Sequence, residues 1–233
     1  MRDLIHYELD FGQLGVKIQD ALEMLHISDD SSDPIYNEVE QIFGQLPQIC
    51  NIRGDIVIYD HVEVLHKEGK IRTDVFEIEP RQRICTYMKD IERIAAFICT
   101  AGEKFTSLAR QLNNSSNFLA GFIVDTFGSI IVEKSMDYIQ GQLQADIQRA
   151  GLLITNRYSP GYCLWPLAGQ RELFNLFPEN KSGITLTESC LMTPMKSVSG
   201  IIGIGRDVKK LRYKCDICND FTCVYRNIKQ RNI

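Results

Sequence analysis

Residues 157–162 read Arg-Tyr-Ser-Pro-Gly-Tyr, and this stretch with its surroundings carries most of what the 233-residue sequence reveals. Arg157 offers a planar fork of donors that suits a carboxylate. Pro160 fixes the local backbone, and Gly161 lets the main chain approach a ligand closely. Tyr162 adds a flat apolar face with a polar tip. The set suits a zwitterionic ligand that carries a ring, although the same residue types taken alone also suit a surface turn.

The segments around this loop predict a mixture of strands and helices. Residues 152–155 and 197–204 have the composition of strands, and residues 170–177 that of a short helix. Upstream, the apolar run 91–99 suits a buried strand that feeds a helix over 103–112. The longest helical pattern follows, over residues 117–150, and it contains glycines that indicate close approach of a neighbour or of a ligand.

In the N-terminal part, the spacing of apolar residues changes once, from a helical period to an alternating one. Apolar residues at three- and four-residue spacing predict helices through the first 48 residues, the second of them starting at Asp33 and Pro34 and ending at Pro47. Residues 50–80 alternate instead, which predicts strands joined by a hairpin with a turn at 67–70. Together the segments predict an α+β fold with an antiparallel or mixed sheet, flanking helices and one long helix.

Composition excludes several classes of protein. Apolar residues make up 44% and charged residues 24%, a usage that rules out a disordered or collagen-like chain. No apolar run approaches the about 18 residues that span a bilayer, and the N-terminus lacks the apolar core of a secretion signal. We therefore expect a soluble cytoplasmic protein with no membrane partner. Five scattered cysteines are then expected to be reduced, buried thiols: Cys50, Cys85, Cys99, Cys163 and Cys190.

The tail from residue 206 onward differs in charge from the rest. It holds eight Lys and Arg residues against three acidic ones, although the whole chain has a net charge of −4. Such a tail contacts an acidic partner or its own acidic body, or is simply solvated. Nucleic acid is not expected as a partner, because only Tyr213 and Tyr225 interleave with the basic residues.

The same tail holds three clustered thiols, Cys215, Cys218 and Cys223. Their spacing allows an iron–sulfur cluster or a zinc ion, a Cys-x-x-Cys redox pair, or free thiols. Both metal interpretations lack a fourth ligand, since all four histidines lie far away in the sequence.

An ordered series of motifs in residues 151–205 resembles a known family. Arg157-x-x-x-Gly161-Tyr162 is followed by Leu-Thr-Glu-Ser within residues 183–189, by Met192-x-Pro194, and by Val-Ser-Gly at 198–200. This series resembles the activation domain of cobalamin-dependent methionine synthase, which binds S-adenosylmethionine (AdoMet). Residues 125–133 also look like the helix that precedes the series in free-standing members.

The resemblance implies a function in reductive methylation. In the family, the domain presents the methyl group of AdoMet to cob(II)alamin while a redox partner such as flavodoxin or ferredoxin supplies an electron. We expect this chain to be a free-standing component that reactivates a cobalamin-binding methionine synthase, or a related corrinoid protein, in trans. Because the chemistry takes place on the cobalamin of the partner, whether this methyltransferase component is itself an enzyme depends on definition.

The resemblance also assigns residues. Arg157 would hold the AdoMet carboxylate, Ser159 and Gly161 would line the methionine or ribose part, and Tyr162 would pack against the ligand. Glu188 would orient the ligand or the partner, or else serve as a salt-bridged structural acid. The divisions expected are an N-terminal helical and hairpin part over 1–90, an AdoMet-binding core over 91–205 and the basic Cys-rich tail over 206–233.

This chain departs from the family in two places, and the first departure favours an alternative function. After Val-Ser-Gly the family continues with Trp-Tyr, whose tyrosine touches the ligand, whereas this chain has Ile201 and Ile202. The N-terminal aspartate that contacts AdoMet in the long enzyme has no clear counterpart. The alternative is a redox or metal-binding accessory module for a corrinoid protein that does not use AdoMet.

Overall fold

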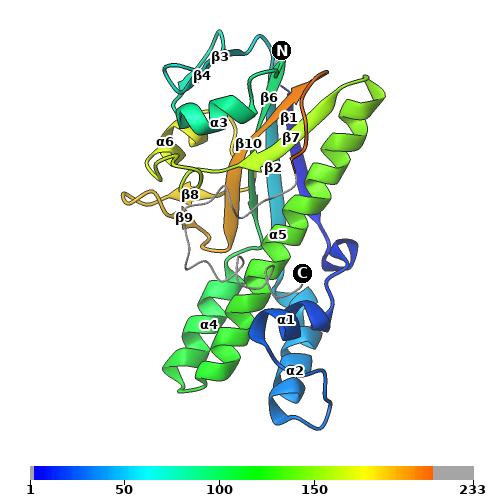
Figure 1. Ribbon diagram of the computed structural model, residues 1–233. Coiled ribbons are helices and arrows are strands. Elements are labelled where there is room, and N and C mark those ends of the chain that lie inside the picture. The colour runs from blue at the N-terminus through cyan, green and yellow to red at the C-terminus, as the bar shows by residue number, and fades with distance from the viewer. Residues whose placement is uncertain (1–2, 212–233) are drawn as a thin grey trace.

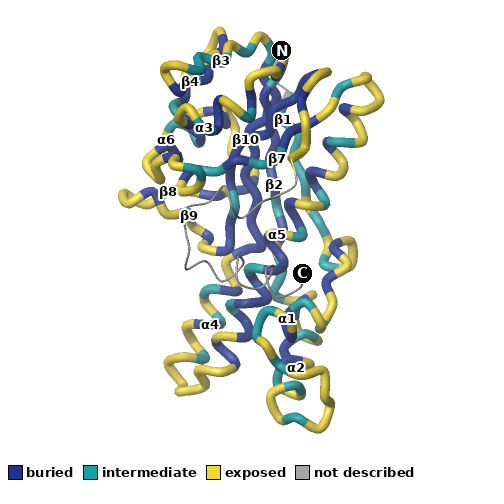
Figure 2. Tube along the Cα trace, in the orientation of Figure 1, coloured by how far each residue is buried: buried dark blue, intermediate teal, exposed yellow. Residues whose placement is uncertain are grey.

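A computed structural model describes residues 3–211 of the chain. Its centre is a five-stranded sheet in the order β1-β2-β6-β10-β7, with every neighbouring pair antiparallel. The strands are β1 (Asp3–Leu9), β2 (Ile52–Tyr59), β6 (Arg93–Thr100), β7 (Leu153–Tyr158) and β10 (Ser197–Gly205). β2, β6 and β10 form the buried centre, and β1 and β7 form the edges (Figure 2).

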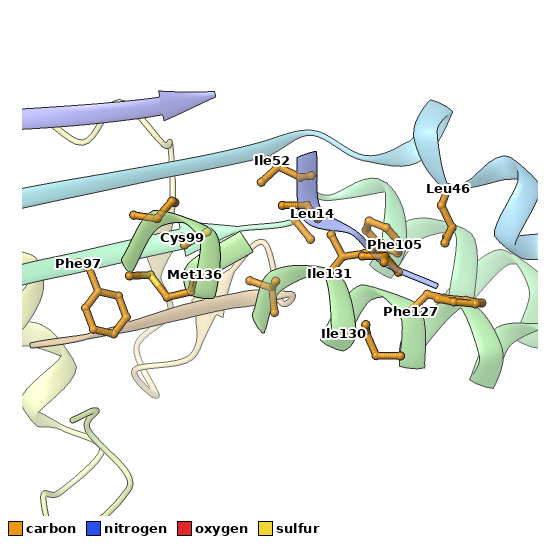
Figure 3. Packing of buried hydrophobic residues seen from close by; sticks show 14 of the residues in the cluster. Leu14, Leu46, Ile52, Phe97, Cys99, Phe105, Phe127, Ile130, Ile131 and Met136 are labelled. Carbon is orange, nitrogen blue, oxygen red and sulfur yellow. The ribbon is translucent and has the colours of Figure 1, made fainter. Parts of the chain in front are cut away.

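One face of the sheet is covered by the 32-residue helix α5 (Phe118–Arg149) (Figure 1). Asn117 caps the helix by accepting a hydrogen bond from the Ala120 amide at 3.3 Å. Side chains alternate along the strands, so Ile56, Phe97 and Ile202 face this helix. Figure 3 shows Phe127, Ile131 and Met136 of α5 in the resulting core.

The first half of α5 continues beyond the sheet and packs with further helices (Figure 1). These are α1 (Ile18–Leu25), α2 (Pro34–Ile49) and α4 (Lys104–Asn114), with the 3₁₀ turn η1 at Phe11–Leu14. Gly128 of α5 lies against α4: a Cβ there would be 3.1 Å from the Phe105 ring and 2.9 Å from Lys196 Cγ. Close packing of helices therefore accounts for this glycine.

The other face of the sheet carries a second core, built from short elements. They are β3 (Glu63–Leu65), β4 (Lys70–Arg72), β5 (Glu77–Ile78), α3 (Arg81–Tyr87), α6 (Gly169–Phe174), β8 (Thr185–Leu186) and β9 (Met192–Thr193). Trp165 is 1% exposed and packs there with Ile201 and Tyr158. Among residues 3–211, no helix is long and apolar enough to cross a membrane.

The α+β class, the antiparallel sheet and the long helix are confirmed, and three local predictions were wrong. The first 48 residues are not all helical, because Asp3–Leu9 forms the edge strand β1. α2 runs through Pro47 to Ile49 rather than ending at Pro47. Residues 52–59 belong to the main sheet, and the hairpin with its turn near 67–70 is formed by β3 and β4, with β5 as a third strand. β1 and β2, from the first 90 residues, lie in one sheet with β6.

Candidate ligand-binding site

A β-bulge in the edge strand β7 sets the direction of Arg157. Ile154 pairs with Ile204 of β10, whereas Arg157 pairs with Ile202, so β7 has one residue more than β10 between the two pairs. In a regular strand, residues three apart face opposite sides. The bulge turns Arg157 to the side of Ile154, which is the side covered by α5.

Arg157 meets two carboxylates on α5. Its Nη2 lies 2.8 Å from Asp137 Oδ1 and 3.3 Å from Glu133 Oε2. Glu133 and Asp137 are four residues apart and therefore on one face of the helix. The Arg157 side chain is 23% exposed, and its Nη1 is buried without a hydrogen-bond partner in the part of the chain that the structure describes.

The electrostatics of this cluster favour a ligand that carries both signs of charge. One guanidinium between two carboxylates leaves a formal charge of −1. Removal from water by the surrounding protein raises the pKa of Glu133, Asp137 raises it further, and Arg157 opposes both. The carboxylate side chains stay 54% and 66% exposed, within reach of a ligand. The cluster thus offers donors for a carboxylate and acceptors for a cationic group.

The loop after β7 is held in a compact turn by Trp165. The Gly161 amide donates to the Trp165 carbonyl at 2.8 Å, and the Trp165 amide donates to the Tyr162 carbonyl at 2.9 Å. Gly161 has φ of +93°, which favours glycine. Because the indole of Trp165 is buried, the turn is fixed while Tyr162 stays 62% exposed.

Ser159 lies where the loop leaves the sheet, against Gly200 of β10. A Cβ on Gly200 would be 2.8 Å from Ser159 Oγ and from the Phe97 ring. Glycine at position 200 therefore allows the start of the loop to lie close to β10. Arg157 thus lies near the end of β7, and Ser159, Gly161 and Tyr162 follow it in the loop that leaves this edge strand.

Glu188 lies in a different place. It is in the turn between β8 and β9, where the Arg171 guanidinium donates to its backbone carbonyl. Arg171 also lines a surface hollow of about 520 Å³ with Asn180 and Ile184. The Glu188 carboxylate is exposed and forms no ion pair within residues 3–211. The structure therefore does not bring Glu188 to Arg157 through a described contact, and its role stays a prediction.

Ile201 and Ile202 are both fully buried, one on each face of the sheet. Cys85, Cys99 and Cys190 are buried as expected, whereas Cys50 and Cys163 are half-buried. Burial raises the pKa of the Cys99 thiol to about 12 and that of Cys85 to about 11, which keeps these thiols protonated and unreactive.

The tail cysteines Cys215, Cys218 and Cys223 lie outside the described residues. Within residues 3–211, no group of three or more His, Cys, Asp and Glu side chains is arranged to hold a metal ion.

Glu133 and Asp137 were not assigned from the sequence. Their signal is an acidic pair at i and i+4 in the helix that precedes the arginine loop. That signal is weak, because such pairs are also typical of solvated helix faces.

Comparison with known proteins agrees with this fold. The family model for the vitamin B12 dependent methionine synthase activation domain matches residues 19–220. Since the match covers most of the sequence, the chain belongs to this family. It is similar to a crystal structure of the MetH reactivation domain bound to AdoHcy, with a TM-score of 0.63 and 15% sequence identity, over 90% of this chain and 80% of that one. At that identity the likeness shows the shared fold. No curated protein matches the chain.

Proposed function

We propose that this chain binds AdoMet at Arg157 and presents its methyl group for the reductive methylation of cob(II)alamin on a methionine synthase or related corrinoid protein, in trans. Family membership supports the class of reaction. The observation that carries the proposal is the ion pairing of Arg157 with both Glu133 and Asp137.

The charges of the site and of AdoMet are complementary. AdoMet has one carboxylate, one ammonium and one sulfonium, and so a net charge of +1. The carboxylate would bind Arg157, whose Nη1 has no described partner. The ammonium or the sulfonium would then bind Glu133 or Asp137, which share Arg157 in the free protein. The site with a charge of −1 is neutral once AdoMet is bound.

The loop supplies the remaining contacts of the proposal. The backbone at Ser159 and Gly161 would line the methionine or ribose part of the ligand. Tyr162, with 62% of its surface exposed, offers a ring face for the adenine. The fixed turn around Trp165 would hold these groups in place before the ligand arrives, which lowers the entropy cost of binding.

The division of labour in the reaction follows from these contacts. The cobalamin of the partner would accept the methyl group once a donor such as flavodoxin or ferredoxin has supplied an electron. The residues of this chain bind AdoMet, orient it and balance its charge. The same proposal places this chain in the cytoplasm, where it would meet methionine synthase and its reductants.

The alternative is a redox or metal-binding accessory module that does not use AdoMet. Two observations favour it: Ile201 and Ile202 are buried core residues where the family has an aromatic pair, and the tail has three cysteines. Iron–sulfur and zinc remain the candidate metals for that tail.

A reactivation assay separates the two functions. The target is a cob(II)alamin methionine synthase that lacks its own activation domain, and the full chain is added with AdoMet, with a reductant, or with both. The proposal predicts recovery of methyl transfer only when both are present. Recovery with reductant alone would contradict the role of AdoMet and favour the accessory module.

A further inference from the structure

A surface hollow of about 520 Å³ lies between α6 and β8, on the side of the sheet that faces away from α5 (Figure 1). The segment from Ile184 to Leu186 lines it, so the hollow follows β8. α6 contributes Arg171 and Phe174 to the same hollow. Its volume is typical of ligand sites, which measure about 300–1,000 Å³. None of the residues proposed to bind AdoMet is among those that line it.

The backbone of Leu186 points its hydrogen-bonding groups away from β9. The Thr187 amide donates to the Leu191 carbonyl at 2.9 Å, and Leu186 lies opposite Met192 at the next position of the register. In an antiparallel pair, positions that exchange hydrogen bonds alternate with positions that do not. The amide and the carbonyl of Leu186 therefore point to the outer edge of β8. Within residues 3–211, no strand pairs with that edge.

Arg171 supplies an unbalanced positive charge to the hollow. It is the only charged residue among the described residues that line it. One guanidinium nitrogen donates to the Glu188 carbonyl, and within residues 3–211 Arg171 forms no ion pair with a carboxylate. A guanidinium has five N–H donors, so this bond leaves donors for a ligand. Because arginine binds carboxylates through two parallel hydrogen bonds, the hollow favours a ligand that carries a carboxylate.

The segment that leads into β8 is held in place before any ligand arrives. Asn180 Oδ1 accepts from the Gly183 amide at 3.0 Å, and Asn180 Nδ2 donates to the Ile184 carbonyl. The Ser182 amide donates at 2.8 Å to Oδ2 of Asp55, a buried residue of β2, and this bond ties the segment to the central sheet. Fixing the edge of β8 in advance lowers the entropy cost of pairing it with an added strand.

We propose that the hollow between α6 and β8 binds an extended, acidic peptide segment of a partner protein. The segment adds as a strand to the outer edge of β8, exchanges backbone hydrogen bonds with Leu186, and places a carboxylate at Arg171. Phe174 and Leu186 offer apolar contact for its other side chains. A small carboxylate would use Arg171 but leave the edge of β8 unpaired, so a peptide fits the hollow better. The inference goes beyond the proposed function and does not rest on it.

Titration of a model peptide into the ¹⁵N-labelled full chain tests the pairing. The probe is acetyl-Thr-Val-Glu-Val-Thr-amide, a strand-forming sequence with one carboxylate, and NMR follows the Leu186 amide. We expect a saturable shift of that amide with a Kd in the millimolar range. The same peptide with N-methyl groups on all its amides keeps its charge but cannot donate to a strand, and it should leave the Leu186 amide unshifted. No shift with the first peptide, or equal shifts with both, would overturn the pairing.

A second set of titrations tests the role of Arg171. Glutamine in place of glutamate in the probe should weaken binding about two- to fivefold, as expected for an exposed ion pair. Arg171→Gln should bind the two probes alike, whereas the control Arg110→Gln, at an exposed position of α4, should discriminate as the wild-type chain does. Equal affinity of the wild-type chain for both probes would contradict the role of Arg171.

Two further titrations separate the occupant and the proposed function. Propionate that shifts the Leu186 amide as far as the peptide does would overturn the peptide as the occupant. Calorimetry with S-adenosylhomocysteine (AdoHcy) on the wild-type chain reports on the site at Arg157. Peptide binding without AdoHcy binding supports the hollow and removes the AdoMet role, and AdoHcy binding without peptide binding does the reverse. Circular dichroism of each variant verifies that the fold persists.

Discussion

Ile154 and Arg157 face the same side of the sheet although they are three positions apart in the strand, because β7 is bulged between them. Thr155 holds the bulge: its Oγ1 accepts from the buried Gly203 amide at 2.9 Å and donates to the Asn156 carbonyl at 2.8 Å. The orientation of the Arg157 guanidinium toward Glu133 and Asp137 thus depends on the Thr155 hydroxyl, two residues away.

Thr155→Val should therefore destabilise the protein and weaken the site. The change preserves shape but leaves the Gly203 amide buried without a partner, at a cost of about 1–3 kcal/mol. Thr126→Val is the matched control, since the Thr126 hydroxyl donates to the Phe122 carbonyl within α5 and its loss leaves no buried donor. Urea unfolding of both variants measures the difference, and equal stabilities would contradict the role given to Thr155.

Two glycines of α5 should respond oppositely to alanine. A Cβ on Gly141 would meet no other atom within 4 Å, so Gly141→Ala should stabilise the helix by about 0.5–1 kcal/mol. Gly128→Ala should destabilise, because its Cβ would press on Phe105 and Lys196. Thermal unfolding of the two variants gives the signs. A stabilising Gly128→Ala would show that α4 and α5 do not pack as described.

The affinity for AdoMet should rise with pH above the ordinary pKa of a glutamic acid. The pKa of Glu133 is raised, and a cationic ligand binds its ionised form. Binding therefore strengthens as pH rises through that raised pKa, and Glu133→Gln should flatten the profile. The neutral zwitterion AdoHcy should show a weaker dependence on pH and on salt than AdoMet does.

Stability has the opposite dependence on pH. The folded state keeps the Glu133 proton to a higher pH than the unfolded state, whose pKa is near the ordinary value of 4.5. Stability is thus lost as pH rises from there through the raised pKa.

Titration calorimetry over this range tests the binding prediction, and an AdoMet affinity that falls with rising pH would contradict the assignment of Glu133.

The tail cysteines should bind a metal if the metal interpretation is right. Three thiolates so close together repel one another unless a cation or a cluster bridges them. Anaerobically purified protein should then contain iron or zinc by elemental analysis, and Cys215→Ser with Cys218→Ser should remove it. Metal-free protein whose tail thiols titrate freely would contradict the metal interpretation and show that the tail cysteines are unliganded.

Local patterns were sufficient to predict α5, β6 and β10, because their apolar residues repeat with the period of the element itself. β1 was missed although Ile5, Tyr7 and Leu9 alternate, since the stronger helical spacing after Leu14 dominated the interpretation. In the site, the sequence indicated Arg157 and its loop. It did not indicate the partners of Arg157, because Glu133 and Asp137 are at least twenty residues away and reach it only through the bulge.

Calorimetric titration of AdoMet into the wild-type chain and Arg157→Ala tests the central claim most directly. Arg149→Ala, at the exposed end of α5, removes an arginine of the same kind from an ion pair with Asp146 and serves as the control. Loss of a charge-assisted carboxylate contact should weaken binding by about 1.5–3 kcal/mol, about 10- to 150-fold, in Arg157→Ala alone. Wild-type affinity in Arg157→Ala, or no binding of AdoMet to the wild-type chain, would contradict the account.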